Sequence, residues 1–169
     1  MNKKKSILII GGTGFLGYHL AIKCKNLKWK ITSVSINKPQ KIRKVKGVIY
    51  KTFNTSIKKN FDKIKNKHFD YVVNLGGYIN HFNKVETYKN HLITVKNLYY
   101  FFKNKKIDCF IQVGSSAEYG SIKSPHKEHN NGKPKLIYGK SKLEATKFLV
   151  KKFEKFSFPV TILRFYQVY

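Results

Sequence analysis

The stretch KSILIIGGTGFLG, residues 5–17, decides the fold of this chain. Its apolar run at 7–10 predicts a short buried strand, and an apolar helical pattern follows the glycines. Gly11 allows a tight turn, Gly14 lets an anion approach the backbone, and Gly17 lets the helix pack closely on the strand. A helix N-terminus adds unpaired N–H groups and a partial positive charge. The stretch therefore predicts a phosphate site, although its G-x-x-G-x-x-G spacing differs from the usual G-x-G-x-x-G. The alternative is a plain turn with a close helix contact.

Strand and helix patterns alternate along the rest of the chain. Short β-branched or apolar runs predict strands at 7–10, 30–36, 48–53, 70–75, 109–113 and 160–165. Apolar residues at helical spacing predict helices at 15–27, 83–104 and 136–155, with a short basic helix or loop at 55–67. This alternation is typical of an α/β protein with a doubly wound parallel sheet, the three-layer α/β/α Rossmann fold. We expect residues 1–169 to form one such domain.

In a sheet of this kind, ligands bind at the carboxyl ends of the strands. The small and polar residues expected there are Gly11–Gly17, Ser35–Lys38, Asn54, Gly76–Gly77 and Ser115–Gly120. The small residues after the strand at 70–75 suit the close approach of a cofactor.

The chain is strongly basic, with a formal net charge of +27. Such a charge suggests nucleic-acid binding, but nearly all of it comes from lysines spread over the whole chain, and the only arginines are Arg43 and Arg164. Base readout and bidentate phosphate contacts favour arginine. We therefore expect no specific nucleic-acid partner, and a basic surface that attracts anionic substrates such as nucleotide diphosphates.

The sequence does not indicate a membrane protein. No apolar run approaches the ~20 residues of a membrane-spanning helix. The basic segment Met1–Lys5 resembles the start of a signal peptide, but the apolar run behind it is short and breaks at Gly11. We expect a cytoplasmic protein. Cys24 and Cys109 have no metal-ligand spacing and are interpreted as small buried residues, so no metal site is predicted.

The sequence YGKSK places Tyr138 and Lys142 four residues apart near the start of a helix. Side chains at this spacing share one helix face, and an ammonium beside a phenol favours the phenolate. The pair can therefore act as a general acid or base, with a serine at the end of the strand at 109–113 sharing the proton network. Because tyrosine and lysine are common in this chain, the pair alone is equally consistent with surface residues.

Taken together, the motifs resemble those of the extended short-chain dehydrogenase/reductase family, also called the NAD-dependent epimerase/dehydratase family. The resemblance rests on four segments in the right order. These are Gly11–Gly17, Ser115–Gly120, Pro134 with Tyr138-x-x-x-Lys142, and Leu163–Tyr169.

The resemblance implies a role for each matching residue. Tyr138 would be the acid/base, and Lys142 would bind the nicotinamide ribose and favour the phenolate. Ser116 would be the hydroxyl partner, with Ser115 as the alternative, because the motif is one residue short. The remaining catalytic candidates are Asn90, matching a helix residue that fixes this region, and Glu118, matching the acid of dehydratases. The cofactor would contact Gly11, Gly14, Phe15, Leu16, Gly17, Ser35, Asn54, Leu75, Gly76, Gly77, Tyr138 and Lys142.

The sequence departs from the family pattern at three positions. The acid that usually binds the adenosine ribose is missing near Ser35 and Asn37, and cations such as Lys38 and Arg43 follow instead. This favours NADP(H) over NAD(H), unless the lysines reflect only the general composition. Asn54 stands where an aspartate commonly meets the adenine, and Gln167 stands where an asparagine usually touches the substrate.

The family usually continues beyond the point that corresponds to Tyr169, so we expect the substrate-binding domain to be absent from this sequence. The resemblance implies an NAD(P)-dependent epimerase, reductase or dehydratase acting on a nucleotide sugar. The alternative is a truncated, non-catalytic dinucleotide-binding remnant or a partner-binding subunit. The resemblance also implies a homodimer through the helices at 83–104 and 136–155, although packing on the sheet explains their apolar positions equally well.

Overall fold

The computed structural model describes residues 4–168 and confirms the predicted α/β fold. Met1–Lys3 of the basic N-terminal segment, and Tyr169 at the end of the last matching segment, lie outside the described residues. The six strands are β1 (Ser6–Ile10), β2 (Lys30–Ser35), β3 (Ile49–Thr52), β4 (Tyr71–Asn74), β5 (Cys109–Ser115) and β6 (Val160–Phe165). They form one parallel sheet in the order β3-β2-β1-β4-β5-β6, so the chain reverses direction across the sheet between β1 and β4.

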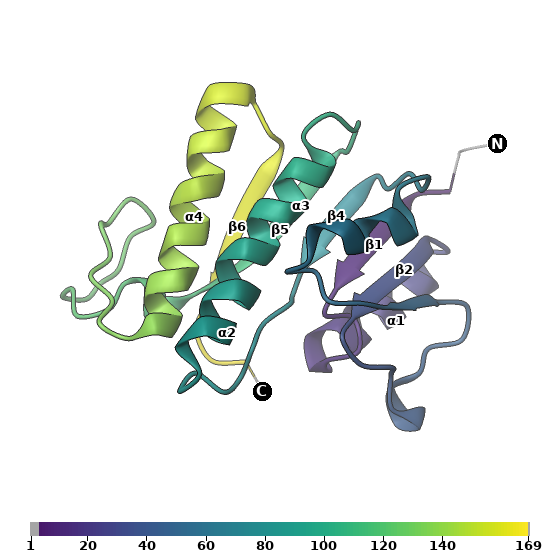
Figure 1. Cartoon of the computed structure of the whole chain (residues 1–169), viewed down its shortest axis with the longest axis horizontal. Helices are drawn as coiled ribbons and strands as arrows, with labels where there is room; N and C mark the ends of the chain where they lie inside the picture. The colour runs from purple at the N-terminus through teal and green to yellow at the C-terminus, as the bar shows by residue number, and fades with distance from the viewer. Residues whose placement is uncertain (1–3, 169) are drawn as a thin grey trace.

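The helices cover the two faces of the sheet unequally. The elements are α1 (Phe15–Asn26), α2 (Lys84–Tyr88), the π turn η3 (Lys89–Ile93), α3 (Thr94–Phe102) and α4 (Ile137–Phe156), with 3₁₀ turns η1 (Lys41–Arg43), η2 (Lys58–Ile64) and η4 (Ser116–Glu118). Figure 1 shows α3 and α4 side by side over one face. Their apolar residues and those of η2 pack there with Leu8, Val72 and Phe110. On the other face, α1 packs on β1 and β2.

This unequal cover corrects one prediction. Cys24 is buried between α1 and the sheet as expected, but Cys109 is only half-buried. Cys109 begins β5 and shares a face with Ile111 and Val113, which are also half-buried. Because α1 lies over β1 and β2, that face of β5 keeps partial contact with solvent.

The predicted helix at 83–104 is present, but a wide turn interrupts it. The five residues of η3 adopt a π conformation between α2 and α3. A π turn inserts one extra residue and rotates the helix faces on its two sides relative to each other. Val85 and Tyr88, in phase with Leu92 in the sequence, are therefore exposed, whereas Leu92 is fully buried.

Asp70 joins the beginnings of β1 and β4. Its Oδ2 accepts hydrogen bonds from the Ser6 backbone N–H at 2.6 Å and from the Ser6 hydroxyl at 2.7 Å. Burial raises the pKa of Asp70, but the hydrogen bonds from Ser6 and His68 outweigh burial and hold the pKa at about 2. The ionised carboxylate thus helps to hold β1 and β4 in their observed register.

We expect acid to remove this contribution. An unfolded aspartate has a pKa of about 3.9, so the stabilisation is complete above that pH and is lost as the pH falls towards the folded value. In urea denaturation at a series of pH values, the free energy of unfolding should fall more steeply between ~pH 4 and ~pH 2 for the native chain than for Asp70→Asn. The control is Asp108→Asn, which removes an exposed partner of Lys5 and should keep the steep fall. Equal slopes for the native chain and Asp70→Asn would contradict the prediction.

Candidate active site

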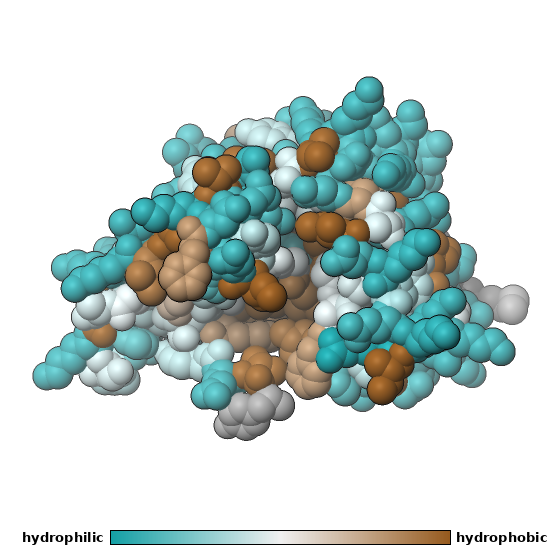
Figure 2. Space-filling model, turned by 60° about the horizontal axis from the view of Figure 1, so that its bottom comes forward, coloured by the Kyte–Doolittle hydropathy of each residue, from teal (hydrophilic) through white to brown (hydrophobic). Residues whose placement is uncertain are grey.

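A cleft opens at the carboxyl ends of β1, β2 and β4, where the strand order reverses. Its volume is about 470 Å³, and the predicted cofactor residues on its walls are Gly11, Gly14, Ser35, Leu75, Gly76 and Gly77. Figure 2 looks at this edge of the sheet and shows the surface hollowed near its centre, with apolar side chains on the walls. Thr13 and Ile36, also on the walls, lie within the ranges expected at this edge. Sequence reasoning did not identify several further wall residues, which come from β2, from the segments after β3 and β4 and from α3: Val34, Phe53, Thr55, Tyr78, Ile79 and Thr94.

The glycine turn forms one end of this cleft. Gly11 has a φ of +78°, a conformation that L side chains rarely adopt, and Gly17 packs α1 so closely that a Cβ would lie 2.5 Å from the Gly11 carbonyl oxygen. Gly14 is different, because an added Cβ there would meet only that same oxygen at 3.4 Å. The turn therefore leaves the N-terminus of α1 uncovered beside the cleft.

Six predicted cofactor residues do not line the cleft: Phe15, Leu16, Gly17, Asn54, Tyr138 and Lys142. Phe15 and Leu16 form the first turn of α1 outside the cleft walls. Asn54 also lies off the walls, since its Oδ1 accepts the Ser56 N–H at 2.8 Å and so closes a local turn. The side chain expected to meet the adenine is thus held by its own loop.

Tyr138 and Lys142 lie on α4, where the helix faces the end of β5. The Lys142 side chain is buried, and its Nζ donates a hydrogen bond to the Val113 carbonyl at 2.9 Å. This ammonium lies 5.9 Å from the centroid of the Tyr138 ring. Burial lowers the pKa of Lys142 to about 8, and the carboxylate of Glu118 opposes that shift. The predicted pair is therefore brought together beside β5, with the cation held at the end of a strand.

The two serine candidates have different surroundings. Ser115 caps the η4 turn, and its Oγ accepts the Ala117 N–H at 3.2 Å. The Ser116 hydroxyl is half-buried and makes no hydrogen bond with any residue among 4–168. The geometry therefore leaves Ser116 free for a ligand and commits Ser115 to the turn.

Glu118 is fully buried in a polar network that joins three elements. Its carboxylate accepts hydrogen bonds from the Ser115 N–H at 2.9 Å, from the Thr146 hydroxyl at 2.8 Å and from Arg164 Nε at 3.0 Å. The Arg164 side chain is only 15% exposed. This placement does not suit the dehydratase acid that the resemblance suggested, because no atom of the carboxylate faces solvent. Glu118 instead ties η4, α4 and β6 together.

Asn90 lies in the π turn and lines the cleft. Its side-chain amide donates to the Glu86 backbone carbonyl at 2.8 Å, which holds the side chain against its own helix. Three consecutive residues of this turn, Asn90, His91 and Leu92, are buried. The turn therefore brings both Asn90 and His91 into the buried region behind the cleft.

Two histidines that sequence reasoning missed surround the Tyr138 ring. His81 stacks on it with ring centroids 4.2 Å apart, and His91 meets it edge to face at 5.1 Å. Neither histidine belongs to a recognisable motif, and His91 is buried within the π turn. A sequence signal for this cluster was therefore absent.

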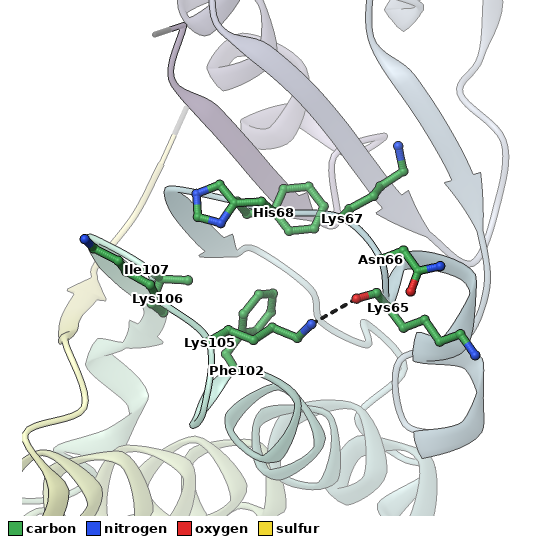
Figure 3. A pocket seen from close by; sticks show the side chains of 9 residues that line it. Lys65, Asn66, Lys67, His68, Phe102, Lys105, Lys106 and Ile107 are labelled. Atoms are coloured by element: carbon green, nitrogen blue, oxygen red, sulfur yellow. Dashed lines mark hydrogen bonds between the residues drawn. The ribbon is translucent and has the colours of Figure 1, made fainter.

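A second cavity, of about 290 Å³, lies at the opposite end of the sheet, between the segments before β4 and before β5. Lysines surround it, which suggests an anion site, but Figure 3 shows the ammonium groups of Lys65, Lys67 and Lys106 pointing away from one another. Lys105 Nζ donates a hydrogen bond to the Lys65 carbonyl oxygen at 3.0 Å. The charges do not converge on a common point, so we assign the functional site to the carboxyl edge.

Residues 7–169 match the family described as the NAD dependent epimerase/dehydratase family. The chain belongs to this family. The match covers nearly the whole sequence and confirms the resemblance seen in its motifs. No curated protein matches the chain in sequence.

Solved structures share this fold at low sequence identity. An epimerase from the methanogen Methanothermobacter thermautotrophicus superposes with a TM-score of 0.90 at 14% identity, covering 99% of this chain and 53% of that one. A UDP-glucose 4-epimerase from Thermotoga maritima, solved with UDP-glucose, gives 0.86 at 20% identity, covering 94% and 54%. A UDP-glucuronic acid 4-epimerase from Bacillus cereus, solved with NAD, gives 0.82 at 21% identity, covering 97% and 57%. The chain thus spans little more than half the length of these structures, and the likeness shows the fold alone.

Two further classes of site were considered for residues 4–168. No group of three or more histidine, cysteine, aspartate or glutamate side chains in this range is arranged to hold a metal ion. Within the same range, no helix combines the length and the apolar character that crossing a bilayer requires.

The Glu118 network leads to a stability prediction. Replacing Glu118 by Gln leaves the guanidinium of Arg164 largely buried without its counter-charge. Breaking a buried pair in this way costs about 3–5 kcal/mol, so we expect a loss of that order in the free energy of unfolding measured by urea denaturation. The matched control is Asp108→Asn, which breaks the exposed pair with Lys5 and should leave the midpoint almost unchanged. Similar midpoints for both variants would show that Glu118 does not anchor the fold.

Replacing Lys142 by an apolar residue should stabilise the fold, whereas replacing Glu118 should destabilise it. Because burial disfavours its ammonium, we expect Lys142→Met to raise the free energy of unfolding at pH 7 by about 1–3 kcal/mol. At pH values between the folded pKa of about 8 and the unperturbed pKa of 10.5, the unfolded chain binds more protons at Lys142 than the native chain does. The stability of the native chain therefore rises with pH in this range. The advantage of Lys142→Met should therefore shrink above pH 8. Lys140→Met, on the exposed face of α4, is the control and should change little. A destabilised Lys142→Met at pH 7 would contradict the prediction.

Proposed function

We propose that this chain is the dinucleotide-binding and catalytic part of an NAD(P)-dependent enzyme that acts on a nucleotide sugar, in the manner of an epimerase or reductase. The observation that carries the proposal is the position of Tyr138 and Lys142 on α4, next to a glycine-walled cleft at the reversal point of the sheet. Sheets of this type bind dinucleotides at that point. Relatives of similar fold were solved with UDP-glucose and with NAD, which supports the substrate and cofactor classes.

The cleft suits a dinucleotide. A Cβ on Gly11 would lie 2.9 Å from the Leu75 backbone, and one on Gly77 would lie 3.2 Å from His91. The backbone at both glycines is therefore packed closely against its neighbours. The pyrophosphate would lie at the N-terminus of α1 beside Gly14. No acidic side chain lines the cleft within the described residues, and Ser35 and Asn37 are on the wall beyond β2. We therefore propose NADP(H) as the preferred cofactor.

The nicotinamide, when bound, would accept or return a hydride at a sugar carbon. Tyr138 would take the proton from the hydroxyl on that carbon and return it to the keto oxygen in the reverse step. The ammonium of Lys142 lies beside this phenol, 5.9 Å from the ring centroid. Ser116, whose hydroxyl is free, would orient the reacting oxygen. Glu118 serves only to hold this end of β5 in place, which argues against a dehydratase.

A second candidate is a dinucleotide-binding subunit without turnover of its own. The two candidates agree on the cofactor and differ in catalysis. A homodimer through α3 and α4 remains a prediction in either case, supported by the exposure of Tyr100, Val150 and Phe153 on these helices.

The first test is a fluorescence titration with NADPH and with NADH. We expect binding of both, with NADPH the tighter. Gly14→Asp should weaken binding at least about tenfold, because it places a carboxylate at the pyrophosphate position. Gly14→Ala is the matched comparison: its Cβ would meet only the Gly11 carbonyl oxygen at 3.4 Å, so the fold should be kept, and binding should weaken less than in Gly14→Asp because the change adds bulk without charge. No binding of either cofactor would overturn the proposal.

Turnover separates the two candidates. With bound cofactor, the catalytic proposal predicts interconversion or reduction of a UDP-sugar such as UDP-glucose by the native chain and none by Tyr138→Phe. Binding of NADPH without turnover in the native chain would favour the non-catalytic subunit.

A further inference from the structure

His91 lies where three parts of the candidate site meet. Its side chain is 3% exposed, and its Nε2 lies 3.3 Å from both the backbone N and the backbone O of Tyr78. Its ring meets the Tyr138 ring edge to face, at 5.1 Å and 78°. The same ring lies against Gly77, where a Cβ would come within 3.2 Å of His91 Cε1. One imidazole therefore contacts both the cleft wall at Gly77–Tyr78 and the proposed acid/base.

The chemical state of His91 suits a hydrogen-bond acceptor. Its pKa is lowered to about 3, mainly by burial and also by the ammonium of Lys142 and by His81, while the bond to Tyr78 acts in the opposite direction. Tyr138 on α4 is the remaining titratable group against the ring. An imidazole that stays neutral has one nitrogen with a free lone pair, and that nitrogen can accept the Tyr78 N–H. Its Nδ1 has no hydrogen-bond partner among residues 4–168, so burying this nitrogen costs free energy.

We propose that His91 is a positioning residue that fixes the cofactor-facing segment Gly76–Tyr78 and the Tyr138 ring relative to each other, through Nε2 on one side and the ring edge on the other. This rests on the proposed function in one respect, that Tyr138 is the group that moves the proton. Near-attack geometry tolerates displacements of well under an ångström, and His91 is the side chain that touches both groups.

His81 completes the surroundings of the phenol and supplies a control. It stacks on the Tyr138 ring at 4.2 Å but is exposed, and it makes no hydrogen bond with Tyr78. A change at His81 therefore disturbs the Tyr138 ring without releasing the cleft wall.

The test uses His91→Phe, His91→Gln and His81→Phe in the full chain. Phenylalanine keeps an aromatic edge near Tyr138 and removes Nε2, whereas glutamine restores a polar group close to the Nε2 position. The first readout is the hydrogen exchange of the Tyr78 backbone amide, followed by NMR. We expect exchange about tenfold faster in His91→Phe, with the amides of β1 and β4 unchanged, and protection restored in His91→Gln and kept in His81→Phe. Unchanged Tyr78 exchange in a folded His91→Phe would overturn the proposal.

The second readout concerns function. His91→Phe should bind NADPH about tenfold more weakly and lower kcat for the UDP-sugar with little change in its KM, and His91→Gln should recover most of both. A purely structural role would lower stability without this split and without rescue. If His91→Phe fails to fold, His91→Gln decides: retained Tyr78 protection supports the proposal, and lost protection overturns it.

The two proposals fail in different ways. If the native chain binds neither NADPH nor NADH, the proposed function fails, and the Tyr78 exchange still decides whether His91 holds the segment. If the native chain binds NADPH but His91→Phe matches it in exchange and affinity, only the positioning role fails.

Discussion

The close approach of α1 to the end of β1 is the constraint on which the site depends. It exists because Gly17 has no side chain: a Cβ there would lie 2.5 Å from the Gly11 carbonyl oxygen and from the Gly12 Cα. With α1 in this place, its uncovered N-terminus faces the cleft at the carboxyl ends of β1 and β4, where the strand order reverses. The cleft walls then follow from the ends of the neighbouring strands. A side chain at Gly17 would push α1 away from β1 and displace its N-terminus, where the proposed pyrophosphate would lie.

The second support of the site is one face of α4. Tyr138, Lys142 and Thr146 recur every four residues, so they lie in a row along the helix. Thr146 donates to the buried Glu118, Lys142 donates to the Val113 carbonyl, and Tyr138 lies furthest along the row, at the cleft. The Glu118–Arg164 pair fastens the same helix to β6. The row therefore combines anchoring, charge and the group proposed to move the proton in a single helix, which keeps the phenol at a fixed distance from the end of β5.

Much of this arrangement follows from the sequence, and the failures have identifiable causes. Apolar runs and glycine spacing predict the six strands, because each run is a local signal. The i, i+4 rule predicts that Tyr138 and Lys142 share a face. The π turn at 89–93 has no such signal, so Val85 and Tyr88 appear to continue the apolar stripe although they are exposed. The half-exposure of Cys109 depends on which helix covers β5, and the buried role of Glu118 depends on Arg164, which is 46 residues away in the chain. Both depend on contacts between segments that are far apart in the sequence, which local sequence patterns do not report.

The polar groups left without partners also point to this edge of the sheet. Among residues 4–168, the buried side-chain atoms that make no hydrogen bond are Ser33 Oγ and His91 Nδ1. Each lies against a glycine of the cleft region, since a Cβ on Gly12 would collide with Ser33 and one on Gly77 would press on His91. Such orphan atoms destabilise a fold by about 1–3 kcal/mol each, and an apolar residue at either position would remove that cost. Together with the buried ammonium of Lys142, they bring three unfavourably buried polar groups of residues 4–168 to the region of the cleft and Tyr138. A concentration of this kind is typical of a site kept for its chemistry, because packing alone would have replaced these side chains.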